Sequence, residues 1–233
     1  MTSLKQLLHS ILITIFYGKL NIFELLSCFK HSKAQLSQDI FALSQLSYKR
    51  NGFFVEFGAA DGIYLSNSYL LEKKYGWVGI LSEPAKIWHK DLKKNRTAHI
   101  EDKCVWMNSN ETLEFFETED PGLSTVSIFN DKDKHSGSRI GSKPYYVETI
   151  SLNEMLAKYE APKEIDFLSI DTEGSEFCIL ESIDFDKYKF KVICCEHNYT
   201  ENREKIFKLL TEKGYQRKNT FLSRFDDWYI NLD

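Results

Sequence analysis

The 233-residue chain lacks the sequence signatures of several common ligand sites. It has no GxGxxG run, which disfavours a dinucleotide pyrophosphate site, and no GxxxxGKS or GxxxxGKT run, which disfavours an ordinary nucleoside triphosphate site. Its five cysteines include no CxxC pair of the kind that binds metal. Cys194 and Cys195 are neighbours in an apolar run, where a strand would point them to opposite faces. We therefore expect reduced, buried thiols in a cytoplasmic protein.

Excess positive charge and long apolar runs are also missing. The formal net charge is -4 and the sequence pI is about 5.9, which argues against broad nucleic-acid binding. His9, Lys19 and Glu24 interrupt the most apolar region, so no unbroken stretch there is long enough to span a bilayer. That region has one lysine near its start and no small-residue cleavage site, so it fits a secretory signal poorly.

Residues 1–33 form an apolar segment of their own. Apolar residues over 4–16 recur at the i, i+3, i+4, i+7 spacing of an amphipathic helix, and a second apolar patch covers 22–29. We expect this segment to pack on the core or on a second copy of the chain. Shallow attachment to the inner face of the membrane is the alternative. Residues 34–233 are expected to form one α/β domain with a substantial core.

Strand and helix signals alternate from residue 34 onward, which predicts a mostly parallel sheet covered by helices on both faces. A helix is expected to begin at Glu83 and Pro84, with the proline in its first position. The last two strand-like segments have no helix signal between them, which predicts an antiparallel hairpin at the sheet edge. The predicted strands lie at 53–57, 77–81, within 99–106, and at 165–170, 190–195, 215–222 and 228–232.

Residues 111–150 interrupt the alternation. Two strand-like runs, ETLEFFE and YYVETI, flank a polar segment that is long for a loop within a domain. We interpret this region as an insertion, either functional or simply solvated.

The run FFVEFGAADG, from Phe53 to Gly62, carries the most information about function. An apolar, β-branched and aromatic strand ends on Glu56 and Phe57 and gives way to glycines and small residues. A buried parallel strand has this composition where it opens into a tight turn whose backbone meets a ligand. The sequence therefore predicts a ligand over the turn that begins at Gly58.

Later strands also end in acidic residues, at Glu83, Asp171 and Glu196. In an open α/β sheet, ligands bind beyond the carboxyl ends of the strands, so these acids are expected at one edge. A carboxylate at the end of the second strand suits a ribose, because it accepts hydrogen bonds from both hydroxyls. Glu83 is therefore the candidate ribose ligand, and Asp61 in the glycine turn is placed to meet a charged amino group.

This pattern resembles the class I S-adenosylmethionine-dependent methyltransferases, and within them the FkbM family. The resemblance covers about residues 35–215 and rests on segments that occur in the expected order. They are QLSQD (35–39), GFFVEFGAADG (52–62), SNSYLLE (66–72), GWVGILSEP (76–84), Asn95-Arg96, VETISLNEML (147–156), IDFLSIDTEGSE (165–176) and VICCEHN (192–198).

The resemblance implies a Rossmann-like sheet of seven strands, mostly parallel with the last strand antiparallel. It also implies that S-adenosylmethionine is the cofactor, with its methionine end beside Gly58, Asp61 and Ser66, its ribose on Glu83, and its adenine near Asp102. Glu56 and Asp171, at the ends of their strands, complete the expected cofactor-binding set.

The acids that end the fourth and fifth parallel strands are the candidate catalytic residues. Asp171, Glu196 and His197 are expected where the methyl group emerges, and in similar metal-dependent O-methyltransferases these strand ends hold magnesium. The three side chains would coordinate Mg²⁺ or, given the histidine, Mn²⁺. Without a metal, His197 is the expected base, oriented by Glu173 or Glu196. Taken singly, each residue would serve equally well as a helix cap or a loop hydrogen-bonding group.

The resemblance implies oxygen methylation, and sugar or glycan hydroxyls are the expected acceptors. Aromatic and basic residues in the 117–146 loop suit sugar faces and anionic groups, or an ordinary solvated surface: Phe129, Lys132, Lys134, His135, Arg139, Tyr145 and Tyr146. A small secondary metabolite is the alternative acceptor. A Rossmann-like module that binds a ligand without catalysis is the alternative from a different class.

Overall fold

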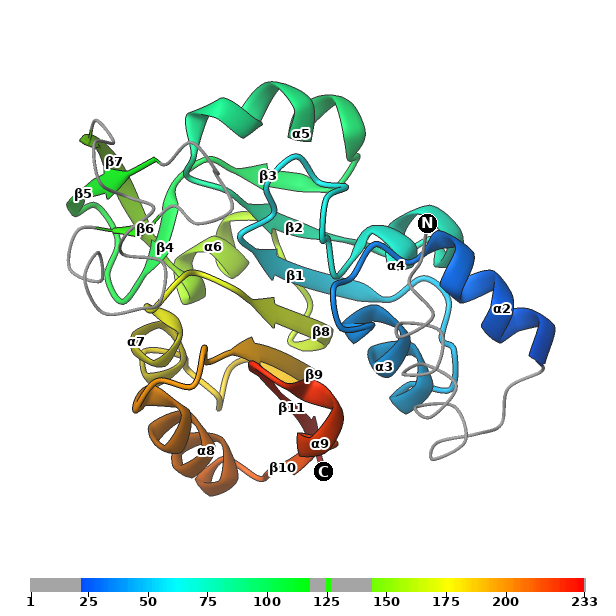
Figure 1. The fold of residues 1–233 in the computed structure, drawn as a ribbon. Coiled ribbons are helices and arrows are strands. Elements are labelled where there is room, and N and C mark those ends of the chain that lie inside the picture. The colour runs from blue at the N-terminus through cyan, green and yellow to red at the C-terminus, as the bar shows by residue number, and fades with distance from the viewer. Residues whose placement is uncertain (1–21, 118–124, 127–143, 233) are drawn as a thin grey trace.

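A computed structural model describes residues 22–117, 125–126 and 144–232, and a seven-stranded sheet runs through the middle of the molecule (Figure 1). The strand order is β10-β11-β9-β8-β1-β2-β3. The five strands from β9 to β3 pair in parallel, whereas β11 is antiparallel to both of its neighbours, β9 and β10. The predicted fold class is confirmed. The strands are β1 (Phe53–Phe57), β2 (Val78–Ser82), β3 (His99–Glu101), β8 (Glu164–Ile170), β9 (Lys189–Glu196), β10 (Tyr215–Lys218) and β11 (Asp226–Asn231).

Helices cover both faces of this sheet (Figure 1). Buried residues of α2 (Ile22–His31), α3 (Gln38–Gln45), α4 (Tyr69–Tyr75) and α5 (His89–Asn95) form one core cluster with one face of the sheet. Buried residues of α6 (Leu152–Lys158), α7 (Glu176–Glu181) and α8 (Asn202–Glu212) form a second cluster with the other face. Two shorter elements complete the set, the 3-10 turn η1 (Lys86–Trp88) and α9 (Thr220–Ser223).

Strand alternation divides the core between the two faces. In β9, Cys195 belongs to the cluster under α6, α7 and α8, whereas Cys194 belongs to the cluster under α2, α3, α4 and α5. This confirms the predicted opposite orientation of the two thiols. All five cysteines are free, and all except the half-buried Cys178 are buried.

A smaller sheet lies beyond β3 and contains both strands predicted in the insertion. Its order is β4-β7-β5-β6, from β4 (Cys104–Trp106), β7 (Pro144–Ser151), β5 (Thr112–Phe116) and β6 (Thr125–Val126). Tyr145 and Tyr146 lie in β7, and the other loop residues considered above, Phe129, Lys132, Lys134, His135 and Arg139, lie outside the described residues.

Two predictions of helix position are wrong. The helix after β2 begins at Lys86 rather than at Pro84, because the Glu83 carboxylate accepts a hydrogen bond from Ala85 N (2.8 Å) and Ala85 itself is extended. The hairpin of β10 and β11 contains the short helix α9, which is bracketed by left-handed or positive-φ residues, Asn219 (φ 55°) and Arg224 (φ 53°).

Residues 1–21 of the predicted N-terminal segment lie outside the described residues, and its boundary at residue 33 stays a prediction. Helix α2, in the same segment, packs against α4: Tyr75 Oη donates to Glu24 (2.7 Å) and lies 3.0 Å from Cys28 Sγ. None of the helices in the described part of the chain is long and apolar enough to cross a membrane.

Candidate functional site

The glycine turn after β1 and the end of β8 touch each other directly. Gly58 has a φ of +70°, and a Cβ added to it would lie 2.2 Å from the carbonyl oxygen of Asp171. A residue with a side chain would therefore be strained by its backbone angle and blocked by β8. The turn predicted to hold a ligand thus lies against the predicted catalytic acid.

The turn is also tied to the end of β2. The amides of Gly58 and Ala59 donate to the carbonyl oxygen of Ser82, at 3.1 and 3.3 Å. Ala60 N donates to Glu83 Oε2 at 2.8 Å. Within the turn, Asp61 Oδ1 accepts from the amides of Ile63 and Tyr64, so this carboxylate closes its own loop.

Glu83 is buried and each of its carboxylate oxygens accepts one backbone hydrogen bond, Oε2 from Ala60 and Oε1 from Ala85. A carboxylate offers about four lone-pair positions, so each oxygen keeps the capacity for another donor. Burial raises the pKa of Glu83 to about 7, against the two amide hydrogen bonds, and the charges of Asp171 and Glu117 raise it further. This geometry fits a ribose diol at the end of β2.

Glu56 and Ser66 bind each other rather than lining an open surface. Ser66 Oγ donates to Glu56 Oε2 (3.0 Å), Asn67 N donates to Glu56 Oε1 (2.6 Å), and Ser68 Oγ also donates to Oε2. The Ser66 oxygen in turn accepts from the amide of Tyr69 and from Arg96. Burial raises the pKa of Glu56, and the charge of Arg96 opposes this.

Asp102, the predicted adenine neighbour, lies on the surface between β3 and β4. Its side chain is 45% exposed and accepts a hydrogen bond from Lys93 Nζ at 2.9 Å. The neighbouring Glu101 is the buried acid at this strand end, and it pairs with Lys158 at 2.7 Å.

Three carboxyl groups gather at the ends of β8 and β9. Asp171, Glu173 and Glu196 each offer one oxygen, and these oxygens lie within 4.8 Å of one another. Burial raises the pKa of Glu196 well above its usual range, and the charges of Asp171 and Glu173 and a hydrogen bond with Asp171 add to the effect. Burial and the neighbouring acids therefore favour the protonated form of Glu196. The group can bind a proton or a cation.

His197 follows Glu196 but takes no part in this group. Its Nδ1 accepts a hydrogen bond from Tyr199 N (3.0 Å), and its Nε2 lies 3.8 Å from Asp227 Oδ1. Asp227 is itself held by Arg203 and Arg217. Burial lowers the pKa of His197, so the ring is neutral near pH 7. Nδ1 thus faces the loop after β9, and Nε2 lies near Asp227 on β11.

Sequence reasoning missed a further buried acid at the same edge, Asp226 at the start of β11. It pairs in register with Glu196, and its Oδ2 accepts a hydrogen bond from Gln38 Nε2 at 2.7 Å. Burial raises its pKa to about 7, partly offset by the Gln38 hydrogen bond, and the Asp171 charge adds to the rise. The sequence contains both members of this pair, Gln38 in the segment QLSQD and Asp226 at the start of the final strand.

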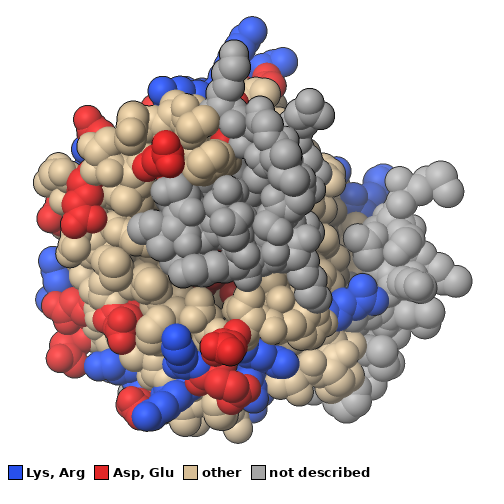
Figure 2. Space-filling view, turned by 60° about the vertical axis from the view of Figure 1, so that its left-hand side comes forward, with Lys and Arg blue, Asp and Glu red and all other residues tan. Residues whose placement is uncertain are grey.

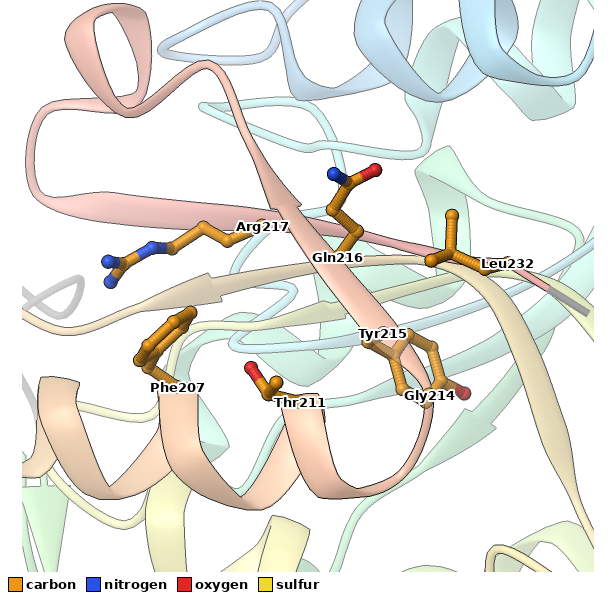
Figure 3. A pocket seen from close by; sticks show the side chains of 7 residues that line it. All are labelled: Phe207, Thr211, Gly214, Tyr215, Gln216, Arg217 and Leu232. Carbon is orange, nitrogen blue, oxygen red and sulfur yellow. The ribbon is translucent and has the colours of Figure 1, made fainter.

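A cavity of about 520 Å³ lies elsewhere, between α8 and the edge strand β10 (Figure 3). Phe207, Thr211, Tyr215, Gln216, Arg217 and Leu232 line it together with Gly214. It contains none of the residues at the carboxyl ends of β1, β2, β8 or β9, and so it is separate from the site described above.

Comparison with known proteins gives one family match. The family model described as "Methyltransferase FkbM domain" matches residues 56–217. No curated protein matches the chain.

Several solved structures are similar to the chain at low sequence identity. A precorrin-6y C5,15-methyltransferase from Geobacter metallireducens GS-15 has 12% identity and a TM-score of 0.45, covering 86% of this chain and 92% of that one. The human methyltransferase 10 domain containing protein has 10% identity and a TM-score of 0.42, covering 98% and 96%. The Methanococcus jannaschii fibrillarin pre-rRNA processing protein has 12% identity and a TM-score of 0.38, covering 78% and 66%.

Proposed function

The chain belongs to the FkbM methyltransferase family, and from this premise we propose that it transfers a methyl group from S-adenosylmethionine to a hydroxyl of a sugar or glycan. The class I methyltransferase fold implies this cofactor, which supplies, when bound, a methyl group on a positively charged sulfur. The proposal rests most directly on one contact. The turn at Gly58 abuts the backbone carbonyl of Asp171. A donor bound over the turn would therefore lie next to this residue, whose carboxylate is the proposed acceptor of the hydroxyl proton.

The residues of the site fit the cofactor. Glu83 has acceptor capacity for two ribose hydroxyls and is held in place by the amides of Ala60 and Ala85. The several buried acids at this edge favour a cationic ligand. Glu56 and Ser66 support the turn from behind, and Asp61 Oδ1 closes it.

Asp171 is the proposed general base. It is the least buried of the three carboxyl groups, and the raised pKa of Glu196 favours the neutral form of its neighbour. In the proposed transfer the acceptor oxygen would take the methyl group, the carbon–sulfur bond of the donor would break to leave S-adenosylhomocysteine, and the Asp171 carboxylate would take the hydroxyl proton. His197 is not proposed as the base, because its nitrogens face Tyr199 and Asp227.

A divalent cation is the second candidate for the same three carboxyl groups. Oxygens of Asp171, Glu173 and Glu196 within 4.8 Å of one another match the preference of Mg²⁺ or Mn²⁺ for carboxylates. A cation there would favour the ionised form of these carboxyl groups and would acidify a coordinated hydroxyl.

Sugars are proposed as acceptors for two reasons. Many FkbM-like enzymes methylate sugar hydroxyls, and β7 carries an aromatic side chain that could stack on a sugar. Tyr146 is 69% exposed, whereas its neighbour Tyr145 joins β7 to the 3-10 turn η1 by accepting a hydrogen bond from Lys86 N (3.1 Å). A small secondary metabolite remains the alternative acceptor, and a non-catalytic module the alternative function.

The first test is calorimetry with S-adenosylmethionine and S-adenosylhomocysteine, followed by transfer of labelled methyl to a panel of glycans. We expect both ligands to bind and glycans to accept label. Absence of binding by both ligands would refute the methyltransferase function, and label only on small metabolites would refute the sugar acceptor.

Asp171→Asn tests the base. We expect kcat to fall about a hundredfold or more with cofactor affinity retained, whereas the exposed Asp186→Asn should behave as the wild type. Unchanged kcat in Asp171→Asn would contradict its role. Chelation separates the two mechanisms. Full activity in EDTA would support Asp171 as a metal-independent base. Loss of activity that Mg²⁺ or Mn²⁺ restores would support the cation-dependent mechanism.

A further inference from the structure

A buried arginine packs against the glycine turn, and no catalytic role is predicted for it. Arg96 is the residue that ends α5, and its side chain is fully buried. Nε donates to Glu72 Oε2 at 2.7 Å and Nη2 donates to Ser68 Oγ at 2.8 Å. Nη1 donates to the carbonyl oxygen of Gly62 and to Ser66 Oγ, both at 3.0 Å. One guanidinium thus holds the turn, the segment after it and helix α4.

The preceding residue makes the parallel contact. Asn95 Nδ2 donates to the carbonyl oxygen of Asp61 at 2.9 Å. Two consecutive carbonyl groups of the turn, those of Asp61 and Gly62, are therefore held by two consecutive side chains from the end of α5. We call this pair, Asn95 and Arg96, the turn clasp.

The arginine also explains the glycine at the end of the turn. Gly62 has a φ of +79°, and a Cβ added there would lie 2.5 Å from Arg96 Cγ and 2.8 Å from Leu92 Cδ1. The backbone of the turn rests directly on the arginine stem. Any displacement of Arg96 is consequently passed to Gly62.

The two acids beside the arginine depend on its charge. Glu56 Oε2 lies 3.9 Å from Arg96 Nη1 and is otherwise occupied by Ser66 and Ser68. Glu72 is buried, which alone would raise its pKa, yet the Arg96 charge and hydrogen bonds from Lys73 and Thr97 lower that pKa to about 2. Arg96 therefore compensates one acid on each side of the turn.

We infer that Asn95 and Arg96 are positioning residues for the donor-binding turn, and that Glu56 and Ser66 act through this clasp rather than by touching the cofactor. The inference rests on the proposed function, because the turn matters to binding only if a donor lies over it. Fixing the turn before binding removes an ordering cost from the affinity of the donor. The clasp should therefore affect S-adenosylmethionine binding more than the chemical step.

Asn95→Ala is the decisive variant, because it removes one hydrogen bond from a half-exposed side chain and leaves no buried charge. We expect the Kd and the KM for S-adenosylmethionine to rise about fivefold, with kcat at saturating donor and the acceptor KM unchanged. Lys94→Ala, at an exposed position of the same helix, is the matched control and should bind as the wild type.

Arg96→Lys is the second variant. It keeps a positive charge for Glu56 and Glu72 but loses the forked geometry, so we expect a rise in Kd of tenfold or more. If this variant does not fold, Asn95→Ala and Gly62→Ala carry the test, and Gly62→Ala should also weaken binding because its Cβ displaces Arg96.

The outcomes separate two kinds of failure. If the wild type binds neither S-adenosylmethionine nor S-adenosylhomocysteine, the proposed function is wrong. If the wild type binds and Asn95→Ala binds equally well, with or without a lower melting temperature, the clasp is only structural and this inference is overturned. A rise in Kd measured well below the melting temperature of a folded variant supports it.

Discussion

Glu83 links the end of β2 to the glycine turn, and its burial sets its protonation near neutral pH. The pKa of about 7 means that the folded protein holds a substantial fraction of this carboxyl as the acid at pH 6 and as the carboxylate at pH 8. Ribose hydroxyls donate to the charged form and favour it. Cofactor affinity is therefore expected to depend on pH through this one side chain.

We predict that S-adenosylmethionine binds about tenfold more weakly at pH 6 than at pH 8, and that Glu83→Gln abolishes most of this slope while weakening binding about tenfold at pH 8. Calorimetry across the range measures both effects. The control is Asp226→Asn, which removes another carboxyl with a pKa of about 7 that is bonded to Gln38. A wild-type slope retained by Glu83→Gln would show that a different group controls binding.

Single residues also show how far the sequence could predict the site. The acids at the strand ends were predictable, because parallel strands bring their carboxyl ends to one edge. The partners of Ser66 were not, since Arg96 reaches it from 30 positions further along the chain. The direction of His197 was not predictable either, because Asp227 on β11 and the amide of Tyr199 determine it.

At the scale of elements, the turn between β1 and α4 depends on close packing between strands. Local sequence identified the turn, because glycine supplies its positive φ. The contact with the Asp171 carbonyl is a tertiary feature that the local sequence does not contain. The wrong prediction of the helix start after β2 has the same origin. The Glu83 side chain accepts a hydrogen bond from Ala85 N, so the helix begins after Ala85.

We predict that Gly58→Ala destabilises the protein by about 3 kcal/mol or more and abolishes cofactor binding, because the added Cβ meets the Asp171 carbonyl. Gly76→Ala is the matched control. It has a similar φ of +69° at the end of α4, but its Cβ would only approach Asn51 Oδ1 at 2.9 Å. We expect a loss of about 1 kcal/mol there with normal affinity. Denaturant unfolding and calorimetry check both variants, and equal effects on binding would contradict the prediction.

At the scale of the whole molecule, charge is distributed very differently inside and outside. On the face in Figure 2, Lys and Arg side chains lie among Asp and Glu side chains. Inside, at the carboxyl edge, buried acids dominate, and burial raises the pKa of Asp39, Glu83 and Asp226 to about 7 each. The ordinary values of these groups are near 4, so each binds its proton more tightly in the folded protein than in the unfolded chain.

We predict that the free energy of unfolding falls as pH rises from about 4.5 to 7 and levels off above that. The stability due to these protons is complete below the unfolded pKa and is lost as pH rises to the folded pKa, on the order of 3 kcal/mol for each group. His197 has the opposite effect below pH 6.5. Because burial lowers its pKa, the unfolded chain binds up to one more proton there, and this single contribution makes stability rise with pH. Glu72, with a pKa of about 2, contributes a constant amount throughout this range.

Denaturant unfolding at a series of pH values tests this prediction. Asp226→Asn should gain stability relative to the wild type at pH 8 and not at pH 4.5, because Asn keeps an acceptor for Gln38 without a charge. Stability that rises steadily from pH 4.5 to 7 would contradict it.

The position of β11 has a consequence for how the protein is made. Strand β10 precedes β11 in the chain, yet β11 lies between β10 and β9 and pairs with both. During synthesis, β10 therefore leaves the ribosome without a neighbour in the sheet, and the exposed edge of β9 awaits a strand not yet translated. Until residues 226–231 emerge, the edge of β9 that carries Glu196 has no partner strand.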